Sequence, residues 1–539
     1  MTEKRDALTL IGRGGTRHAV TPEACGAKAA ELQLMSKLGL NVPPAFVLST
    51  ALCAEVNAGD PRALHSIEDL IAKGLHHLEQ QTGRRFGDAR RPLLVSVRSG
   101  AARSMPGMLE TVLDVGMNDV TVLGLMRLFG NPRLAFDSYR RFVEAYCEVV
   151  AELPRDAFEA VLKETIAKEN AASVAELDPE ALENLTRAYL TLARETFGKP
   201  VPADPVTQVR EAVAAVYRSW EAPKAREYRK LNGLENLEGT AVTIQAMVFG
   251  NAGFTSGAGV AFSRNPATGE KGLYADFLFD AQGEDVVSGR RQAGGVALLE
   301  QRLPDLASQL KEGVAMLETA CKDMQDVEFT IESGELYFLQ TRAAKRTPRA
   351  ALKAAVDLLH EGLIDEKEAL RRVEEIDLNH VGVARFAGTA QAIAEAIPAA
   401  PGTATGQIAF DSETATAMAK NGTPVILIRP DIATDDVAGI AAAAGIVTAI
   451  GGRTAHAAVV ARQLGKVCLV GCRSLIIDLP ARQARLGDTL IAENDWLSLD
   501  GSSGEIFLGR REIIVEEPQA ELAEIARWKQ RAASRIAIA

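Results

Sequence analysis

One segment combines three structural signals in immediate succession and restricts the fold more than any other. Residues 445–450 (GIVTAI) have the composition and length of a buried strand, Gly451 and Gly452 follow as a turn, and an alanine-rich helical pattern begins near residue 454. A strand, a glycine turn and a helix in this order are typical of α/β domains. Paired glycines also let the backbone approach a ligand closely.

The helix of this segment begins with a histidine. Thr454 is a suitable N-cap, which places His456 in the first helical turn. Free N–H groups and the positive end of the helix dipole stabilise an anion there, and they keep the imidazole neutral and nucleophilic. We therefore expect His456 to attack phosphorus and carry a phosphoryl group. An ordinary surface or packing histidine is the alternative, and it is our interpretation of the other six, His18, His65, His76, His77, His360 and His380.

A second candidate site follows the strand-like residues 93–97 (LLVSV). They lead into Arg98 and a loop that contains Gly100 and Gly107. An arginine at a strand end beside such a loop can bind a triphosphate, although glycine loops after strands are common. No GxxxxGK[ST] motif occurs, so a P-loop enzyme is disfavoured.

The segment DVEFTIESGELYFLQTR, residues 326–342, predicts a β-hairpin with its turn at Ser333 and Gly334. Alternate residues of a strand share a face, so Asp326 and Glu328 point the same way, about 7 Å apart. Two carboxylates at this spacing can hold Mg²⁺ against phosphate oxygens. The alternative is a solvated hairpin with a charged outer face.

The turn of this hairpin decides which side chains meet. We expect a three-residue or bulged turn, which sets Glu328 opposite Gln340 and Asp326 opposite Arg342. A strict two-residue turn would send the second pair to the other face.

The charge balance and the cysteines restrict the possible partners. Of the 539 residues, 60 are Lys or Arg and 71 are Asp or Glu, for a net charge of -11, which disfavours broad binding to nucleic acid or anionic membranes. The six cysteines lack the density of a secreted scaffold, and no apolar stretch has the length of a signal peptide or membrane span. We predict a cytoplasmic protein without a nucleic-acid or membrane partner. Cys468 and Cys472 are interpreted as packing residues rather than zinc ligands.

The periodicity of the chain indicates its organisation. The first hundred residues mix helix and strand patterns, and we expect their strands to share a domain with those at 241–249, 259–262, 274–279 and the hairpin. Between them lies a helical insert with expected helices at 132–153, 157–168, 179–197 and 206–231.

The second half begins with a helical pattern at 349–375. The run at 398–406, rich in Ala, Pro and Gly, is interpreted as a linker or the beginning of the next domain. That domain has expected strands at 424–428, 445–450, 466–470, 489–492, 496–499 and 505–508, and a helix follows from 516.

Several of these segments resemble one enzyme family, pyruvate phosphate dikinase. GGRTAHAAVVARQLGKVCLVGC is similar to its phosphohistidine segment, with Arg453 where the family usually has methionine and Ala455 where it has serine. Four segments resemble its ATP-grasp portion: VSVRSGAARSMPGM, TIQAMVFGNAGFTSGAGVAFSRNPATGEKGLY, AQGEDVVSG and DVEFTIESGELYFLQTRAAKRT. GAKAAEL, which contains Lys28, resembles the segment that supplies the family's phosphate-binding lysine. The similarity covers nearly the whole chain in unbroken order.

The resemblance implies a multidomain α/β fold. We expect an ATP-grasp nucleotide-binding domain over 1–345 with a mostly helical insert at about 118–230, a helical linker over 346–394, a swivelling α/β phosphohistidine domain over 395–512, and a helical tail over 513–539.

The resemblance also implies roles for individual residues. His456 is pyrophosphorylated and then phosphorylated, Thr454 is its partner, and Arg453 either contacts the anion or faces solvent. The residues implied to bind ATP are Lys28, Arg98 and Arg342 at the phosphates, Gly107 in the loop, Gln245, Met247 and Val248 near the adenine, and Glu284 and Arg291 on the phosphate-side wall. Mg²⁺ is assigned to Glu328 and Gln340, assisted by Asp326.

Enzymes of this family continue into a (β/α)8 barrel for pyruvate or phosphoenolpyruvate, and no remainder of that size follows residue 508. We therefore expect a phosphotransferase that uses ATP and inorganic phosphate to load His456, releases AMP and pyrophosphate, and delivers phosphate to pyruvate on a separate acceptor-binding subunit. Delivery to another small molecule and a regulatory ATP-binding protein without turnover are the alternatives. The set Lys28, Arg98, Glu328, Arg342 and His456 argues against the regulator.

Overall fold

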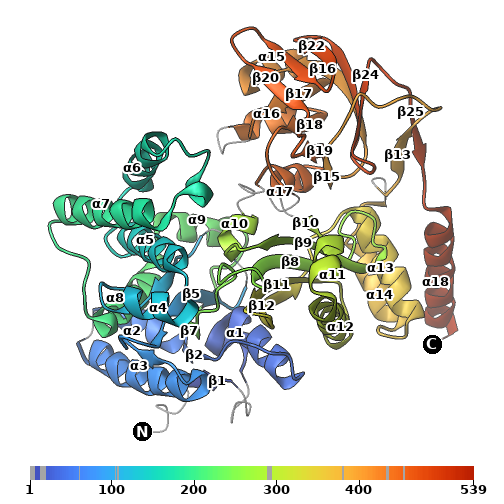
Figure 1. Cartoon of the computed structure of the whole chain (residues 1–539). Helices are drawn as coiled ribbons and strands as arrows, with labels where there is room; N and C mark the ends of the chain where they lie inside the picture. The colour runs from blue at the N-terminus through green and yellow to red at the C-terminus, as the bar shows by residue number, and fades with distance from the viewer. Residues whose placement is uncertain are drawn as a thin grey trace. The chain divides into compact units, whose positions relative to one another are not determined.

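The computed structural model (Figure 1) describes residues 7–12, 20–59, 61–103, 105, 108–287, 294–378, 381–431, 436–452 and 456–538. The chain forms two compact units. The first holds Met1–Phe254, Ile331–Ser333 and Tyr337–Thr341, and the second holds Thr255–Thr330, Gly334–Leu336 and Arg342–Ala539.

The first unit is built on a five-stranded antiparallel sheet. Its order is β1 (Leu8–Ile11), β2 (Ala45–Leu48), β7 (Thr240–Ala246), β5 (Val95–Ala101) and β6 (Thr111–Val115). Every residue of β2 and β7 is buried, so the centre of the sheet is covered on both faces. Helices α1 (Pro22–Lys37), α2 (Ala51–Asn57) and α3 (Pro61–Thr82) pack against it, and β3 (Arg85–Phe86) pairs with β4 (Pro92–Leu93).

The expected helical insert is present. It contains α4 (Thr121–Phe129), α5 (Pro132–Val149), α6 (Arg155–Lys168), the short 3-10 turn η1 (Val174–Glu176), α7 (Pro179–Phe197), α8 (Pro205–Ser219) and α9 (Pro223–Leu231). The single helix expected over 206–231 was wrong, because α8 ends at Ser219 and Pro223 begins a new helix. Proline lacks an N–H and its fixed φ suits the first position of a helix, not the interior.

A separate sheet belongs mostly to the second unit, although residues 331–332 and 337–341 of its last two strands are assigned to the first unit. Its order is β10 (Gly294–Gly295), β9 (Lys271–Phe279), β8 (Gly257–Arg264), β11 (Gln325–Glu332) and β12 (Glu335–Ala343). Of the later strands that we expected to share a domain with the early ones, β7 alone joins the early strands in one sheet. Both edges of β7 are occupied by β2 and β5, so β8 has no edge there to pair with. Helices α10 (Gly283–Val287), α11 (Val296–Arg302) and α12 (Pro304–Cys321) accompany this sheet.

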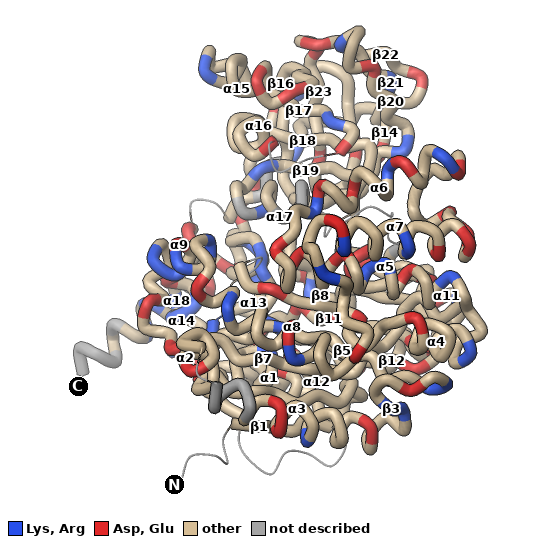
Figure 2. The backbone as a smooth tube through the Cα atoms, turned by 90° about the vertical axis from the view of Figure 1, so that its left-hand side faces the viewer, with Lys and Arg blue, Asp and Glu red and all other residues tan. Residues whose placement is uncertain are grey.

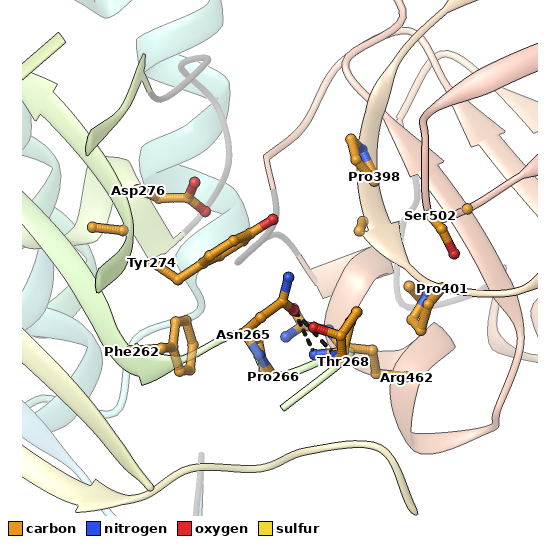
Figure 3. A pocket seen from close by; sticks show the side chains of 15 residues that line it. Phe262, Asn265, Pro266, Thr268, Tyr274, Asp276, Pro398, Pro401, Arg462 and Ser502 are labelled. Carbon is orange, nitrogen blue, oxygen red and sulfur yellow. Dashed lines mark hydrogen bonds between the residues drawn. The ribbon is translucent and has the colours of Figure 1, made fainter. Parts of the chain in front are cut away.

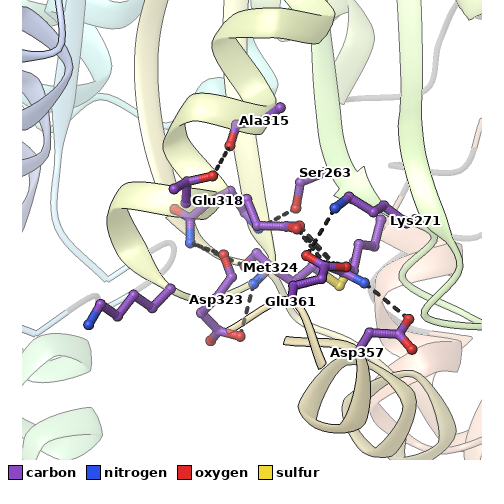
Figure 4. Close-up of polar contacts among 12 residues, drawn as sticks. Ser263, Lys271, Ala315, Glu318, Asp323, Met324, Asp357 and Glu361 are labelled. Carbon is purple, nitrogen blue, oxygen red and sulfur yellow. Dashed lines mark hydrogen bonds and ion pairs between the residues drawn. The ribbon is translucent and has the colours of Figure 1, made fainter. Parts of the chain in front are cut away.

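A cluster of charges around the buried Arg264 ties this sheet to helices next to it in the sequence (Figure 4). Arg264 on β8 is 0% exposed and contacts Glu318 on α12 at 2.7 Å, Asp357 at 3.1 Å and Glu361 at 2.9 Å. Lys271 on β9 contacts Glu361 at 2.9 Å. Because a buried guanidinium is stable only when its charge is compensated, the cluster fixes β8, α12 and α13 (Pro348–His360) together.

The helical pattern over 349–375 forms two helices, α13 and α14 (Glu366–Glu374), with Gly362 at φ 71 between them. The last helix, α18 (Gln519–Ile538), packs on both through the buried side chains of Ile525 and Trp528. His360 also contacts Glu524 of α18, with Nε2 and Oε1 2.7 Å apart. A two-stranded antiparallel ribbon pairs β13 (Val383–Phe386) with β25 (Ile513–Glu516). In the sequence, β13 follows α14 and β25 precedes α18.

The last sheet has eight strands. Their order is β14 (Ala394–Glu395), β24 (Glu505–Leu508), β23 (Trp496–Asp500), β16 (Thr403–Ala409), β17 (Val425–Arg429), β18 (Gly445–Thr448), β19 (Val467–Val470) and β15 (Ile397–Ala400). The strands β16 to β19 are parallel, and α15 (Ser412–Lys420), α16 (Val437–Ala442) and α17 (His456–Gln463) lie between them in the sequence. A small sheet of β20 (Leu475–Asp478), β21 (Gln483–Leu486) and β22 (Thr489–Ala492) is inserted between β19 and β23 in the sequence.

The run at 398–406 begins this domain and is not a linker. It contains most of β15 and the first half of β16, joined by a turn at Gly402 with φ 109. Pro398 is tolerated within β15 because β15 is an edge strand, where a missing N–H disrupts no central ladder.

Figure 2 shows basic and acidic residues interspersed along the chain, with a local group of basic residues at α9. Across the described residues, no helix combines the length and apolar character needed to cross a membrane.

Candidate functional site

Lys28 and Arg98 are brought to the same strand end by a close contact of two backbones. Gly26 interrupts α1 with φ 80, and a Cβ at this position would lie 2.0 Å from the carbonyl oxygen of Gly100. Only glycine allows this approach of α1 to β5. Lys28 follows within the helix and donates a hydrogen bond from Nζ to the carbonyl oxygen of Ser99, at 3.0 Å.

Arg98 connects this strand end to the predicted hairpin. Its Nη2 donates a hydrogen bond to Oε1 of Gln340, at 3.3 Å. Arg98 is partly exposed, whereas Gln340 is 8% exposed. Three of the residues predicted from the sequence, Lys28, Arg98 and Gln340, therefore lie together in the first unit.

The residues implied for adenine lie on and after β7. Gln245 pairs with Ser96 of β5 and Ala45 of β2, and its buried amide donates a hydrogen bond to the carbonyl oxygen of Pro43, at 3.1 Å. Met247 and Val248 are partly exposed. Their side chains therefore reach the surface of the unit directly beside the buried β7.

The hairpin turn differs from the expected one. It contains only Ser333 and Gly334, with φ 51 and 84, the positive values typical of two-residue hairpin turns. The expected contact nevertheless forms, since Arg342 Nε donates a hydrogen bond to Asp326 Oδ2 at 2.8 Å.

Asp326 is in an environment that suits a bound cation. Burial raises the pKa of Asp326, and the nearby charges of Arg342 and Arg462 oppose that rise. Its Oδ2 accepts from Arg342, but no described residue donates a hydrogen bond to its buried Oδ1. A buried carboxylate oxygen without a donor fits Mg²⁺, which prefers oxygen ligands. Within the described ranges, no group of three or more His, Cys, Asp or Glu could hold a metal ion.

His456 is the first residue of α17. The helix follows β18 and leads into β19, and these two strands are parallel neighbours, so His456 lies at the carboxyl end of a parallel strand. Ligands of open α/β sheets bind at such ends. Ala458 and Ala461 of α17 are fully buried in the core shared with Ile446 and Cys468. Arg453 and Thr454 lie outside the described residues.

Within the second unit, a cavity of about 70 Å³ is lined by residues that were not predicted as site residues from the sequence (Figure 3). Tyr274 and Asp276 reach it from β9, and Arg462 reaches it from α17. Arg462 is the last residue of the AAVVAR stretch that follows His456. Its closeness to His456 in the sequence is the signal that could have indicated it as a site residue.

The other predicted residues are more dispersed. Glu284 is exposed on the short helix α10. Gly107 and Arg291 lie outside the described residues. Cys468 and Cys472 are both buried among apolar side chains, as expected for packing residues, and burial raises the pKa of Cys468 to about 12.

Comparison with known proteins identifies both halves of this arrangement. Residues 60–304 match the family described as pyruvate phosphate dikinase, AMP/ATP-binding domain, and residues 422–504 match the PEP-utilising enzyme, mobile domain. The chain is thus a multidomain α/β protein that combines an ATP-grasp nucleotide-binding domain with a phosphohistidine domain.

Individual relatives agree. The chain is 44% identical over 489 residues to pyruvate, phosphate dikinase of Clostridium symbiosum, covering 90% of this chain and 56% of the relative. It is 42% identical over 507 residues to the chloroplastic enzyme of Flaveria pringlei (93% and 53%) and 42% identical over 532 residues to that of Oryza sativa subsp. japonica (98% and 56%). The resemblance to pyruvate, phosphate dikinase is confirmed, and the chain spans little more than half the length of these relatives.

Proposed function

We propose that this protein is an ATP-dependent phosphotransferase that loads His456 with phosphate, as pyruvate, phosphate dikinase does. The observation that carries the proposal is the position of His456 as the first residue of α17, at the carboxyl end of β18. A phosphoryl group on this residue lies where helix N–H groups stabilise an anion. The convergence of Lys28, Arg98 and Gln340 in the first unit supports a phosphate-binding role for these residues.

The proposed reaction has two steps. A ring nitrogen of His456 attacks the β-phosphorus of ATP, the bond from the α,β-bridging oxygen to that phosphorus breaks, and AMP leaves. An oxygen of inorganic phosphate then attacks the terminal phosphorus, the bond between the bridging oxygen and that phosphorus breaks, and pyrophosphate leaves. One phosphoryl group remains on His456. Such transfers require mainly positioning and charge stabilisation.

Within this proposal each predicted residue has a part. Lys28, Arg98 and Arg342 bind phosphates. Glu328, Gln340 and Asp326 would hold Mg²⁺, which neutralises phosphate charge when it is bound. The adenine is assigned to Gln245, Met247 and Val248, the phosphate side to Gly107, Glu284 and Arg291, and support of His456 to Thr454 and Arg453.

The proposal extends to the acceptor and the organisation of the chain. Pyruvate is the proposed acceptor, and its binding by a separate protein stays a prediction, as does a cytoplasmic location. We retain the domain limits 1–345, 346–394, 395–512 and 513–539 as part of the proposal.

Labelling with radioactive ATP tests the function. The protein is incubated with Mg²⁺ and ATP carrying label in the β- or the γ-phosphate, with and without inorganic phosphate. We expect acid-labile, base-stable label from both positions without phosphate, and loss of the γ-label as pyrophosphate when phosphate is added. His456→Ala should take up no label, whereas the control His360→Ala should label normally. Absence of label on the wild-type protein under all conditions would overturn the proposal and favour a regulatory ATP-binding protein.

A test with pyruvate separates the acceptor from the loading reaction. Formation of phosphoenolpyruvate by labelled protein alone would contradict the need for a separate acceptor-binding protein, while label transfer to another small molecule would contradict pyruvate.

A further inference from the structure

Glu332, the last residue of β11, holds the segment that follows β7. Its Oε2 accepts a hydrogen bond from the backbone N–H of Phe249 at 2.8 Å, and its Oε1 accepts one from Arg84 Nη2 at 2.7 Å. The side chain of Glu332 is only 9% exposed. A buried carboxylate with one donor on each oxygen has a fixed orientation, because losing either donor leaves an unsatisfied charge. All three residues belong to the first unit.

The two donors of Glu332 are themselves held by one aromatic ring. The guanidinium of Arg84 lies 5.5 Å from the ring centroid of Phe129, the last residue of α4. The ring of Phe249, which is 1% exposed, meets the same ring edge-on, with centroids 5.4 Å apart and planes at 65°. Arg84, Phe129, Phe249 and Glu332 therefore form a closed cluster, called the Glu332 cluster below.

The Glu332 cluster fixes one end of the segment proposed to contact adenine. At the other end, the backbone N–H of Met247 donates a hydrogen bond to the carbonyl oxygen of Leu94 at 2.9 Å. The anchored N–H groups belong to Met247 and Phe249, with Val248 between them, and Met247 and Val248 are both partly exposed. With both ends held, these two residues have little freedom to change shape.

We propose that Glu332 is a positioning residue for adenine recognition. It holds Met247 and Val248 in the shape that contacts the base, and it acts through the backbone of Phe249 without touching the nucleotide. The inference rests on the proposed function, since it requires that the protein bind ATP through these residues. Because the phosphates are assigned to Lys28 and Arg98 on α1 and β5, loss of Glu332 should weaken binding of the nucleoside and spare binding of the polyphosphate.

The test compares the binding of two ligands, ATP and inorganic tripolyphosphate. Both are measured by calorimetry on the full chain in the presence of Mg²⁺. Glu332→Gln offers one acceptor for two donors, and we expect its Kd for ATP to rise about tenfold, equivalent to about 1.4 kcal/mol. Its Kd for tripolyphosphate should stay within about twofold of the wild-type value. In the labelling assay, KM for ATP should rise while the rate at saturating ATP is kept.

Two further variants keep the test decisive if Glu332→Gln folds poorly. Arg84→Met leaves the bond from Glu332 to Phe249 in place, and we expect a smaller loss of ATP affinity, about threefold, with tripolyphosphate again unaffected. Glu318→Gln removes a comparably buried carboxylate that pairs with Arg264 in the second unit, and it should change neither ligand's affinity.

Each result has a defined meaning. Unchanged ATP affinity in both Glu332→Gln and Arg84→Met would overturn the inference and leave the proposed function standing. Equal losses for ATP and tripolyphosphate would also overturn it, because they indicate a general structural role. Failure of the wild-type protein to bind ATP would overturn the proposed function and this inference together.

Discussion

Arg98 on β5 donates a hydrogen bond from Nη2 to Oε1 of Gln340 on β12, across 3.3 Å. The two residues are separated by 242 positions in the sequence, and both were assigned to ATP from sequence motifs. Because the guanidinium has further N–H groups in a planar fork, a bond to Gln340 orients it without exhausting its capacity for phosphate.

Arg98→Lys is expected to impair ATP use although it keeps the positive charge. An ammonium group cannot bridge Gln340 and a phosphate in the same planar geometry, so we expect kcat/KM for histidine labelling to fall about 100-fold, or about 2.7 kcal/mol. Arg127→Lys, at an arginine that donates to the carbonyl oxygen of Ala89, is the control and should change little. A labelling rate for Arg98→Lys within threefold of wild type would refute the assigned role.

Gly26→Ala tests the close approach of α1 to β5. The added Cβ would overlap the carbonyl oxygen of Gly100, and the alanine would have to adopt an unfavourable positive φ. We therefore expect a loss of about 2–4 kcal/mol in unfolding free energy and much weaker ATP binding. Gly39→Ala is a matched control, because Gly39 has φ 81 but nothing within 4 Å of its Cβ position. It should cost only about 1 kcal/mol. Equal effects of the two substitutions in urea denaturation would exclude a special role for Gly26.

A buried ion cluster on α5 makes the first unit sensitive to acid. Burial by itself raises the pKa of Asp137, but the guanidinium groups of Arg141 and Arg140, at 2.9 and 2.8 Å, outweigh it and hold the pKa well below its ordinary value. The unfolded chain therefore binds a proton before the folded one does. Stability from this group is fully present above the unfolded pKa of about 4 and is lost as the pH falls toward the lower folded value.

Asp137→Asn should remove that pH dependence. We expect a loss of about 3–5 kcal/mol at pH 7, because the buried Arg140 and the partly exposed Arg141 lose the carboxylate that they share, and a shallower decline of stability between about pH 5 and pH 3. Denaturant titrations at several pH values measure both effects. A variant whose stability keeps the wild-type slope over this window would show that another group is responsible.

Arg264→Met is expected to destabilise the second unit. The substitution leaves the carboxylates of Glu318, Asp357 and Glu361 without their shared guanidinium, and loss of one partner from a buried ion cluster typically costs about 3–5 kcal/mol. Adding Glu318→Leu to Arg264→Met should recover part of the loss, since it removes the most deeply buried of the three carboxylates. Thermal or urea unfolding of the single and double variants checks the prediction, and equal stability of all three proteins would contradict it.

Asp326→Asn should raise the Mg²⁺ requirement. The amide is a weaker ligand than the carboxylate, and we expect the Mg²⁺ concentration for half-maximal labelling of His456 to increase about tenfold. Asp323→Asn is the control, because that carboxylate pairs with Arg346 at 2.7 Å and has no assigned metal role. In the wild-type protein the Mg²⁺ requirement should also rise on acidification, since burial raises the pKa of Asp326 and its protonated form binds metal poorly. An unchanged Mg²⁺ dependence would remove Asp326 from the proposed site.

Local sequence patterns were sufficient where local forces decide the structure. The helix over 179–197 was predicted with its exact limits because an aspartate N-cap, a first-turn proline and a final glycine mark them. The beginning of α17 near His456 was likewise predicted from a strand, a glycine turn and an alanine-rich run.

Predictions failed where distant segments compete for the same partner. The strands predicted at 259–262 and 274–279, in one domain with the early strands, form a separate sheet, because β7 is already paired on both edges. A three-residue or bulged turn was expected in the hairpin, because a strict two-residue turn was expected to send Asp326 and Arg342 to opposite faces. The structure instead keeps a two-residue turn and the contact together.

The sequence by itself determined the chemistry that is available: a histidine at a helix start, basic residues at a strand end and two carboxylates on one strand. Only the tertiary structure decided which groups meet, as when Glu332 receives donors from 83 and 248 positions away. The physical reason is that a charge has a strong effect only after it has been removed from water, and the surroundings that remove it come from remote parts of the chain.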